Sequence, residues 1–257
     1  MNINGQQLEV LLIKGIKASP ALAPIVFLHE GLGSVSMWTQ RGLDWPLAVC
    51  QATGRSGVVY SRRGYGRSEP VPPGRHVLQP DYLHREASEM LPALIAALDI
   101  DCPVLLGHSD GASIALLYAS RLQVAACIAM APHVVVEGVA INAIAQSMQA
   151  FKTGDLRARL AKHHKDVDGA FWQWNDVWLS EGFATFDMRM DCSRISSSLL
   201  LIQGADDEYG TMSQLDHIAK AAPHAQQIRL PQCGHSPHRD QPERTLQAVA
   251  AFLSSVQ

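Results

Sequence analysis

The sequence predicts an α/β protein with a mostly parallel central sheet, helices on both of its faces and a helical cap insertion. Strand-length apolar runs alternate with longer helical segments along most of the 257 residues, which is typical of strand–helix–strand crossovers. The apolar runs contain few polar residues, as expected for parallel strands that are covered on both faces. One long segment breaks this alternation and predicts the insertion.

Six apolar runs are the predicted strands of the parallel sheet: residues 25–28, 57–60, 103–106, 124–131, 198–204 and 226–231. An earlier segment, QLEVLLIKG at residues 7–15, predicts a further strand, antiparallel at the sheet edge.

Three segments between or after these runs are predicted helices: residues 81–98, 112–122 and 240–254. Pro80 and Asp81 mark a helix start. Pro92 predicts a kink in the first helix, because proline removes a backbone donor and crowds the preceding turn.

Residues 134–194 contain no convincing strand and form the predicted cap, so that residues 1–133 and 195–257 form the core. Four large aromatic residues fall within eight positions of the insertion: Phe171, Trp172, Trp174 and Trp178. They are expected to pack the cap onto the core, to roof a ligand pocket, or to do both. We place the three tryptophans among the pocket residues.

The composition excludes several classes of protein. With 47% hydrophobic and 18% charged residues, the chain can bury a substantial core. The net charge of −3 and the absence of a basic run give no reason to expect nucleic acid or a membrane as partner. We find no secretory signal and no membrane-spanning apolar stretch. The expectation is a cytoplasmic protein, either a monomer or a homodimer.

The five cysteines are scattered and include no C-x-x-C pair. This pattern favours small buried hydrophobic residues over disulfides or a zinc site. We therefore expect no metal.

Ser109 is the candidate nucleophile, with Gly107 and Gly111 two positions away on either side. Such a spacing alone is weak, because a glycine-rich turn can produce it. Its context is stronger, since a predicted strand ends just before it and a helix is expected from Asp110. The G-x-S-x-G pattern indicates a nucleophile in this strand–turn–helix setting: a strained turn exposes the hydroxyl, and the glycines allow strand and helix to approach.

A serine needs a base to accept its proton and an acid to orient that base. Candidates for both roles follow later predicted strands. Three acidic residues follow the strand at 198–204: Asp206, Asp207 and Glu208. Two histidines, His235 and His238, follow the strand at 226–231. All these positions lie at carboxyl ends of strands, where open α/β sheets bind their ligands.

Five segments, FLHEGLGS, SRRGYGRS, GHSDGAS, GADDEYG and CGHSPHRDQPE, make the chain resemble the α/β-hydrolase superfamily from about residue 10 to the C-terminus. It is similar to capped esterases and to hydrolases that cleave carbon–carbon bonds. The resemblance implies that Ser109 is the nucleophile, His235 the base and Asp207 the acid. Asp206 and Glu208 remain the alternative acids, and His238 is expected to be a pocket-wall or supporting residue.

The same resemblance implies that the backbone N–H groups of Gly31 and Asp110 form the oxyanion hole. The chain departs from the family at Glu30, where the family usually has glycine. Glu30 is either a loop carboxylate that pairs with Arg62, Arg63 or another donor, or a group that selects a substrate amine or hydroxyl.

The resemblance also implies that the SRRGYGRS loop is mainly structural, with Tyr65 as the side chain that could reach the pocket. His133 ends the strand at 124–131 and is expected to line the pocket.

The predicted function is therefore a hydrolase that uses no cofactor and cleaves a small to medium, partly apolar ester through an acyl-enzyme. Thioesters, lactones and C–C bonds beside a carbonyl are alternative substrates for the same three residues. Two alternatives of another kind remain: a ligand receptor that turns over slowly, and a perhydrolase without cofactor. Ser109 itself argues against epoxide hydrolases and haloalkane dehalogenases, which attack through a carboxylate.

Overall fold

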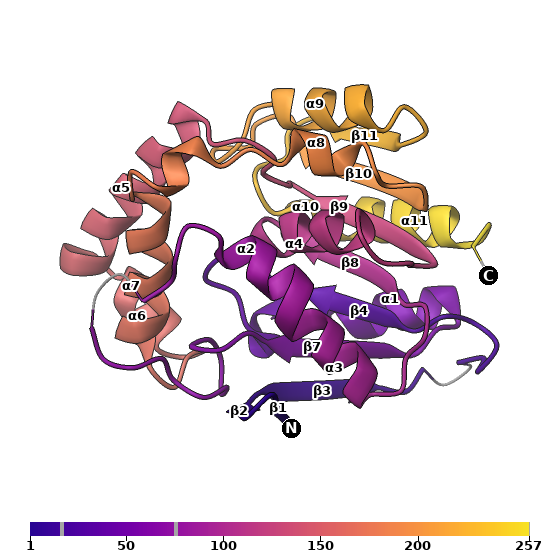
Figure 1. Ribbon diagram of the computed structural model, residues 1–257, viewed down its shortest axis with the longest axis horizontal. Helices are drawn as coiled ribbons and strands as arrows, with labels where there is room; N and C mark the ends of the chain where they lie inside the picture. Colours follow the sequence, from indigo (N-terminus) through magenta and orange to yellow (C-terminus); the bar gives the residue numbers. More distant parts are fainter. Residues whose placement is uncertain (16–17, 75–76, 257) are drawn as a thin grey trace.

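A seven-stranded sheet forms the centre of the molecule, whose computed structural model describes residues 1–15, 18–74 and 77–256 (Figure 1). Its strands run in the order β11-β10-β9-β8-β4-β7-β3. Their bounds are β3 (Glu9–Ile13), β4 (Ile25–Leu28), β7 (Gly57–Ser61), β8 (Val104–His108), β9 (Ala126–Met130), β10 (Ser198–Gly204) and β11 (Gln226–Leu230). Neighbours pair in parallel except at the edge, where β3 is antiparallel to β7. The predicted fold class and edge strand are confirmed.

Two smaller antiparallel pairs lie outside this sheet. They are β1 (Asn2–Ile3) with β2 (Gln6–Gln7), and β5 (Thr39–Gln40) with β6 (Leu43–Asp44). A short 3-10 helix at Val35–Trp38 precedes the second pair.

Alternate residues of the central strands pack into cores on opposite faces of the sheet, as the two-residue period of a strand requires. In β4, Ile25 and Phe27 belong to one core and Val26 and Leu28 to the other. The first core is covered by α1 (Trp45–Thr53) and α11 (Pro242–Leu253). The second is covered by α3 (Leu91–Ala97), α4 (Asp110–Ala119) and α9 (Ser213–Ala221). Both faces of the sheet are therefore buried, which explains the near-continuous apolar runs.

The predicted helix at residues 81–98 is divided into three parts. They are α2 (Tyr82–Arg85), a π-helical segment (Glu86–Met90) and α3 (Leu91–Ala97). The π-helical segment ends two residues before Pro92, whose missing N–H interrupts the regular hydrogen-bond ladder.

Other helix boundaries also differ from the prediction, and several whole helices were not predicted. The final helix begins at Pro242, because Gln241 leaves the helical region after the separate α10 (Pro237–Asp240). Helices α1 and α9 were not predicted. For α1 the sequence does contain signals: the Asp44 carboxylate accepts from the Leu47 N–H at 3.0 Å, and Gly54 ends the helix with φ 66°.

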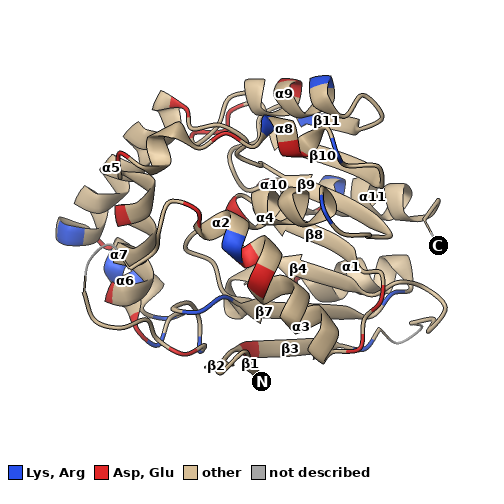
Figure 2. Cartoon of the chain, viewed as in Figure 1, with Lys and Arg blue, Asp and Glu red and all other residues tan. Residues whose placement is uncertain are grey.

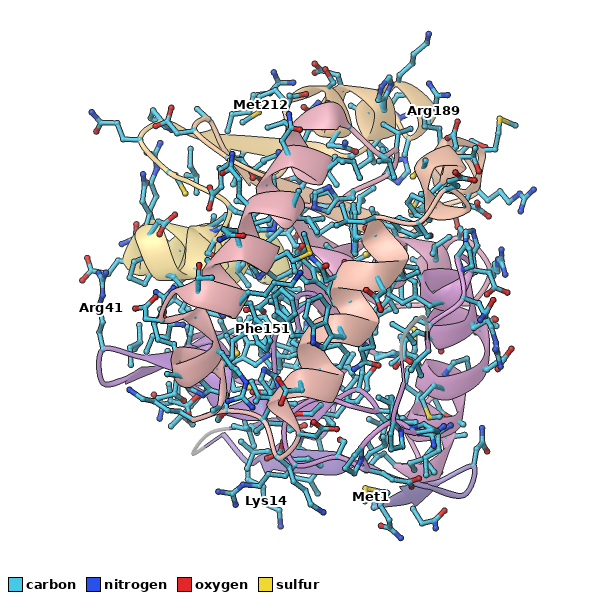
Figure 3. The ribbon with its side chains drawn as sticks, turned by 90° about the vertical axis from the view of Figure 1, so that its left-hand side faces the viewer. Met1, Lys14, Arg41, Phe151, Arg189 and Met212 are labelled. Atoms are coloured by element: carbon cyan, nitrogen blue, oxygen red, sulfur yellow. The ribbon has the colours of Figure 1, made fainter. Side chains whose placement is uncertain are left out.

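Three helices of the predicted cap stand together at one end of the molecule (Figure 1). They are α5 (Gly138–Thr153), α6 (Leu156–Leu160) and α7 (Val167–Trp178). Phe151 of α5 stacks on Phe171 of α7 with ring centroids 3.8 Å apart, and it lies between the two helices in Figure 3. The chain returns through a 3-10 turn at Phe183–Thr185 and α8 (Arg189–Cys192), which packs on α4 and α9. The division at residues 134 and 194 stays our interpretation of this arrangement.

Charged side chains lie mainly on the outer helices and loops, whereas β4, β8 and β9 carry none (Figure 2). Among the described residues, no helix combines the length and apolar character needed to cross a membrane.

Glycine is required where α4 crosses the sheet. A Cβ atom on Gly111 would lie 2.1 Å from the carbonyl oxygen of Leu28 in β4. A Cβ on Gly107 would lie 2.1 Å from the carbonyl oxygen of Gly111. Both contacts are with backbone, so the start of α4 would have to move away from the sheet to admit a side chain.

We predict that Gly111→Ala lowers the free energy of unfolding by at least about 1–3 kcal/mol, the usual cost of overpacking a rigid site. Urea unfolding at pH 7 measures the change. Gly138→Ala at the start of α5 is the matched control, because a Cβ there meets nothing within 4 Å. It should leave stability unchanged or raise it by up to about 1 kcal/mol. Equal unfolding free energies for the two variants would contradict the steric argument.

Candidate active site

Ser109 occupies a strained turn between β8 and α4. Its backbone has φ 54° and ψ −121°, a conformation that a residue with a side chain seldom adopts. The surrounding main chain holds it there: the Ser109 N–H donates to the Met130 carbonyl at 2.9 Å, and its carbonyl accepts from Ala112 and Ser113. The strain is therefore built into the junction of strand and helix.

The structure brings Ser109, His235 and Asp207 together from the ends of three different strands. Ser109 Oγ lies 2.9 Å from His235 Nε2, and His235 Nδ1 lies 2.8 Å from Asp207 Oδ1. The two alternative acids have other surroundings. Asp206 is exposed, and the Glu208 carboxylate accepts from the backbone N–H of His235 at 3.1 Å. Of the three acidic residues, Asp207 is thus the one whose carboxylate contacts the His235 ring, and its role as the acid stays a prediction.

Four donors hold the Asp207 carboxylate in place. Besides the imidazole, it accepts the backbone N–H groups of Tyr209 at 2.8 Å and Gly210 at 3.1 Å, and the Gln203 side chain at 3.1 Å. Burial raises the pKa of Asp207. The hydrogen bond and charge of His235, together with the backbone N–H of Tyr209, outweigh burial and leave the pKa of Asp207 below its usual value.

An ionised Asp207 only accepts hydrogen bonds, so the proton of the neutral imidazole belongs on Nδ1 of His235. The Nε2 lone pair then faces the hydroxyl of Ser109. This tautomer can accept the proton of Ser109, which is the task of a general base.

The two amides predicted to form an oxyanion hole belong to Gly31, in the loop after β4, and to Asp110, the residue directly after Ser109. Neither the Gly31 nor the Asp110 N–H donates a hydrogen bond to another residue in the described part of the chain. Asp110 is the first residue of α4, where backbone N–H groups have no partner inside the helix. Their catalytic role stays a prediction.

Helix α7 covers the site with residues one turn apart. Trp174 lies so close to Gly31 that a Cβ there would come within 2.1 Å of the indole Nε1. The Trp178 ring lies against the His133 ring, with centroids 5.0 Å apart, and the Trp178 indole N–H donates to the Asp110 carboxylate at 3.3 Å. Because Trp174 and Trp178 share one face of the helix, both reach the core loops.

Trp172 points in a different direction from these two tryptophans. Its ring contacts Phe151 of α5, with centroids 5.8 Å apart, and the Lys152 ammonium lies 5.5 Å from its centroid. These contacts are with the other cap helices, and the assignment of Trp172 to the pocket stays a prediction.

His133 lies beside the candidate base, with its ring centroid 5.6 Å from that of His235. Burial, with a smaller contribution from His235, lowers the pKa of His133 to about 3, so its ring is neutral near pH 7. Its Nδ1 has no hydrogen-bond partner among the described residues.

Glu30 is paired within the protein. Its carboxylate accepts from Arg239 of α10 and lies 3.4 Å from Nδ1 of His108. Burial raises the pKa of Glu30, but Arg239 and His108 outweigh it and hold the pKa well below its usual value. Arg62, an expected partner of the side chain, instead donates to the Glu30 main-chain carbonyl at 3.0 Å. These contacts favour the loop-carboxylate interpretation over a role in selecting substrate.

His238, three residues after His235, is buried in the core. Its ring lies 4.9 Å from Trp38, 5.5 Å from Trp45 and 4.8 Å from His108, between centroids. Neither ring nitrogen has a hydrogen-bond partner among the described residues. Burial, followed by the charges of His108 and Arg239, lowers the pKa of His238 well below 6.5.

Several residues at the site were not predicted from the sequence. The Tyr209 ring lies 4.8 Å from that of His235, and His108 Nε2 donates to the His235 carbonyl at 2.8 Å. The Tyr82 hydroxyl donates to the Asp110 carboxylate at 2.7 Å. Tyr209 and His108 lie within the motifs around Asp207 and Ser109, so motif position was an available signal for them. Tyr82 had no comparable signal.

Comparisons with known proteins agree with this fold. The family model described as "Alpha/beta hydrolase family" matches residues 25–248. A Pseudomonas syringae pv. syringae protein named "Putative carbamate hydrolase RutD" is 28% identical over 263 residues, covering 91% of this chain and 95% of that protein. The mouse sn-1-specific diacylglycerol lipase ABHD11 is 26% identical over 264 residues, covering 91% of this chain and 81% of its own.

Among solved structures, the enol-lactonase from Burkholderia xenovorans LB400 superposes with a TM-score of 0.73 and 19% identity, covering 99% of each chain. At that identity the likeness concerns the fold alone.

We predict that His238→Leu makes the protein less sensitive to acid. Below pH 6.5 the unfolded chain binds a proton at His238 that the folded chain excludes, so stability falls as pH decreases, by up to about 1.4 kcal/mol per pH unit for each such group. Urea unfolding at pH 7 and pH 5 should show a smaller loss of stability for the variant, by roughly 1–2 kcal/mol. An equal loss in both proteins would show that His238 takes up its proton in the folded state.

Proposed function

Because the chain belongs to the alpha/beta hydrolase family, we propose that it is a serine hydrolase that needs no cofactor and cleaves small to medium, partly apolar esters. The observation that supports this most strongly is the unbroken hydrogen-bonded path from Ser109 through His235 to Asp207, with distances of 2.9 Å and 2.8 Å. The strained backbone of Ser109 at the end of a parallel strand adds independent support.

In the proposed reaction, Ser109 Oγ attacks the ester carbonyl carbon while His235 Nε2 takes the hydroxyl proton. The carbonyl oxygen becomes an oxyanion that the N–H groups of Gly31 and Asp110 stabilise. The intermediate collapses, His235 protonates the departing alcohol, and an acyl-enzyme remains. Water then repeats the sequence with His235 as base and releases the acid and free Ser109. Asp207 stabilises the imidazolium in both halves.

The surroundings of Ser109 favour a compact, partly apolar acyl group. Trp174, Trp178 and the neutral His133 supply aromatic surface beside the triad. Ser109 itself is only 6% exposed. A site enclosed in this way strengthens the interaction between the amide dipoles and the developing charge, because little water competes.

We predict sustained hydrolysis of short p-nitrophenyl esters that falls by at least about 10³-fold in Ser109→Ala, because the nucleophile is removed. Steady-state and burst-phase release of p-nitrophenol measure it. Ser113→Ala is the control, since Ser113 Oγ bonds the His133 carbonyl at 2.7 Å and does not face the base. A single stoichiometric burst without turnover would instead support a receptor. Full activity in Ser109→Ala would contradict the proposed nucleophile.

Asp207→Asn should reduce kcat by about 10³–10⁴-fold, because an amide in place of the carboxylate favours the wrong tautomer of His235. Asp206→Asn, one residue earlier and exposed, should stay within about twofold of the wild type. The same ester assay compares the two variants. A larger loss in Asp206→Asn than in Asp207→Asn would reassign the acid.

A further inference from the structure

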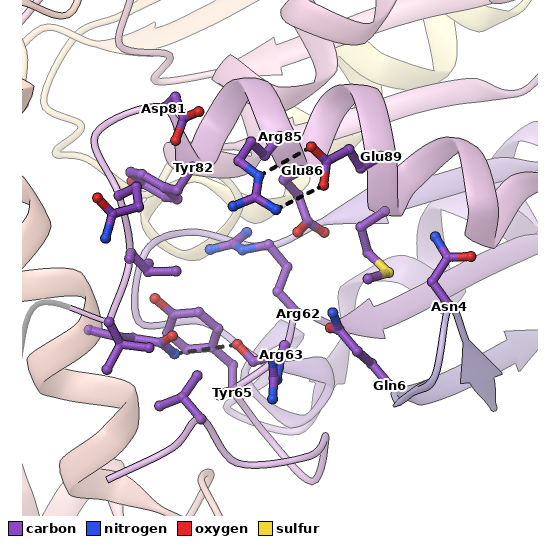
Figure 4. Close-up of a pocket in the computed structure, with 16 residues that line it drawn as sticks. Asn4, Gln6, Arg62, Arg63, Tyr65, Asp81, Tyr82, Arg85, Glu86 and Glu89 are labelled. Atoms are coloured by element: carbon purple, nitrogen blue, oxygen red, sulfur yellow. Dashed lines mark hydrogen bonds and ion pairs between the residues drawn. The ribbon is translucent and has the colours of Figure 1, made fainter. Parts of the chain in front are cut away.

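Arg62 is a buried arginine that the mechanism above does not use. It directly follows β7, and its side chain is only 5% exposed. Figure 4 shows its guanidinium between the loop after β7 and the segment that carries Tyr82 and Glu86, at the wall of a cavity of about 430 Å³. A buried cation is costly unless it is fully paired, so its partners indicate why it is there.

Its first partners are two consecutive carbonyls of the loop after β4. Arg62 Nη1 donates to the carbonyl of His29 at 2.6 Å, and Nη2 to that of Glu30 at 3.0 Å. The Glu30 carbonyl and the Gly31 N–H belong to the same peptide group, and in a trans peptide the two point in opposite directions. By binding the carbonyl, Arg62 turns the Gly31 N–H away from itself.

The same peptide group has a second anchor. The Glu30 carbonyl also accepts from His29 Nδ1 at 2.7 Å, while His29 Nε2 accepts the backbone N–H of Arg62 at 3.0 Å. Burial and the nearby Arg62 lower the pKa of His29 well below 6.5, which keeps this ring neutral and able to play both parts. Rotation of the Glu30–Gly31 peptide would break these two hydrogen bonds, and also the one that the Gly33 N–H donates to the same carbonyl at 3.0 Å.

Arg62 has two further partners: its guanidinium lies over the Tyr65 ring, 5.1 Å from the ring centroid, and Arg62 Nη2 lies 3.7 Å from Oδ2 of the Asp110 carboxylate. That carboxylate is also bound by the Tyr82 hydroxyl and the Trp178 indole N–H. Asp110 is the first residue of α4. Holding its side chain therefore fixes the turn from which its backbone N–H projects.

We propose that Arg62 is a positioning residue that holds both donors of the oxyanion hole, the amides of Gly31 and Asp110, in their working orientation. This rests on the proposed function, because it assigns a purpose to those two amides. A planar guanidinium can bind two carbonyls and a carboxylate at once, whereas a lysine ammonium lacks this fork of donors. Loss of Arg62 therefore weakens binding of the transition state more than binding of the substrate.

The test compares Arg62→Met and Arg62→Lys with Arg67→Met, a matched exchange at an exposed position in the same loop. Three quantities are measured: kcat and KM for a p-nitrophenyl ester, the affinity for phenylboronic acid, and the final stoichiometry of labelling by a fluorophosphonate. The boronic acid forms a bond from Ser109 Oγ to boron, the proton passes to His235, and the resulting tetrahedral anion probes the oxyanion hole. In the fluorophosphonate reaction Ser109 Oγ bonds to phosphorus, and fluoride and the proton leave.

We expect kcat of Arg62→Met to fall by about 10²–10³-fold, the range seen when a single oxyanion donor is lost. Phenylboronic acid should bind at least about tenfold more weakly, because the boronate adduct, like the transition state, is tetrahedral and loses the same hydrogen bonds. KM should change by less than about threefold. The fluorophosphonate should still label Arg62→Met to a final stoichiometry of one label per chain. Arg62→Lys should be intermediate in kcat and boronate affinity, and Arg67→Met should stay within about twofold of the wild type.

A folded Arg62→Met protein with wild-type kcat would overturn the proposal. So would a fall in kcat without a fall in boronate affinity, since the defect would then lie outside the oxyanion hole. If Arg62→Met fails to fold, Arg62→Lys decides: wild-type kcat and boronate affinity overturn the proposal, and a parallel loss of both supports it. Failure of the wild type to be labelled at Ser109 would overturn the proposed function itself, and this inference with it.

Discussion

The close contact between the start of α4 and the ends of β4 and β8 is the constraint on which the rest of the site depends. It is possible only because Gly107 and Gly111 lack side chains, and it forces Ser109 into a left-handed backbone conformation. The same turn frees the Asp110 amide at the start of a helix. A local steric requirement thus sets the positions of the candidate nucleophile and of one candidate oxyanion donor together.

Buried charges connect the loops around this turn. Arg62 joins the loop after β4 to Asp110, and Glu30 joins the same loop to Arg239, just beyond His235. Each charge lies in a setting where an unpaired ion would be strongly unfavourable. The ion pairs therefore favour the one arrangement of the loops in which every buried charge has its partner. Helix α7 attaches to these buried charges as well, since Trp178 donates to the Asp110 carboxylate. The cap and the turn that holds Ser109 therefore share a support.

A feature could be predicted from the sequence when it depends on residues that are close together in the chain. Contacts between distant residues could not be predicted in this way. The strands could be recognised from their continuous apolar runs, and the turn at Ser109 from the glycines around it, because both patterns are local. The partner of Glu30 could not, because Arg239 lies 209 residues further along the chain. The sequence spacing alone does not separate Trp172 from Trp174 and Trp178, whereas the structure places the Trp172 ring against Phe151 of α5. Only the packing of α7 shows which tryptophans reach the core loops.

The central claim is that Ser109 forms a covalent acyl-enzyme, and trapping that intermediate tests it most directly. Wild-type protein mixed with p-nitrophenyl acetate, quenched in acid within the burst and analysed by mass spectrometry should gain one acetyl group. Peptide mapping should locate that group on Ser109, within the sequence Gly-His-Ser-Asp-Gly, and it should be absent from Ser109→Ala. Sustained turnover with no adduct, or with the acetyl group on another residue, would contradict the account.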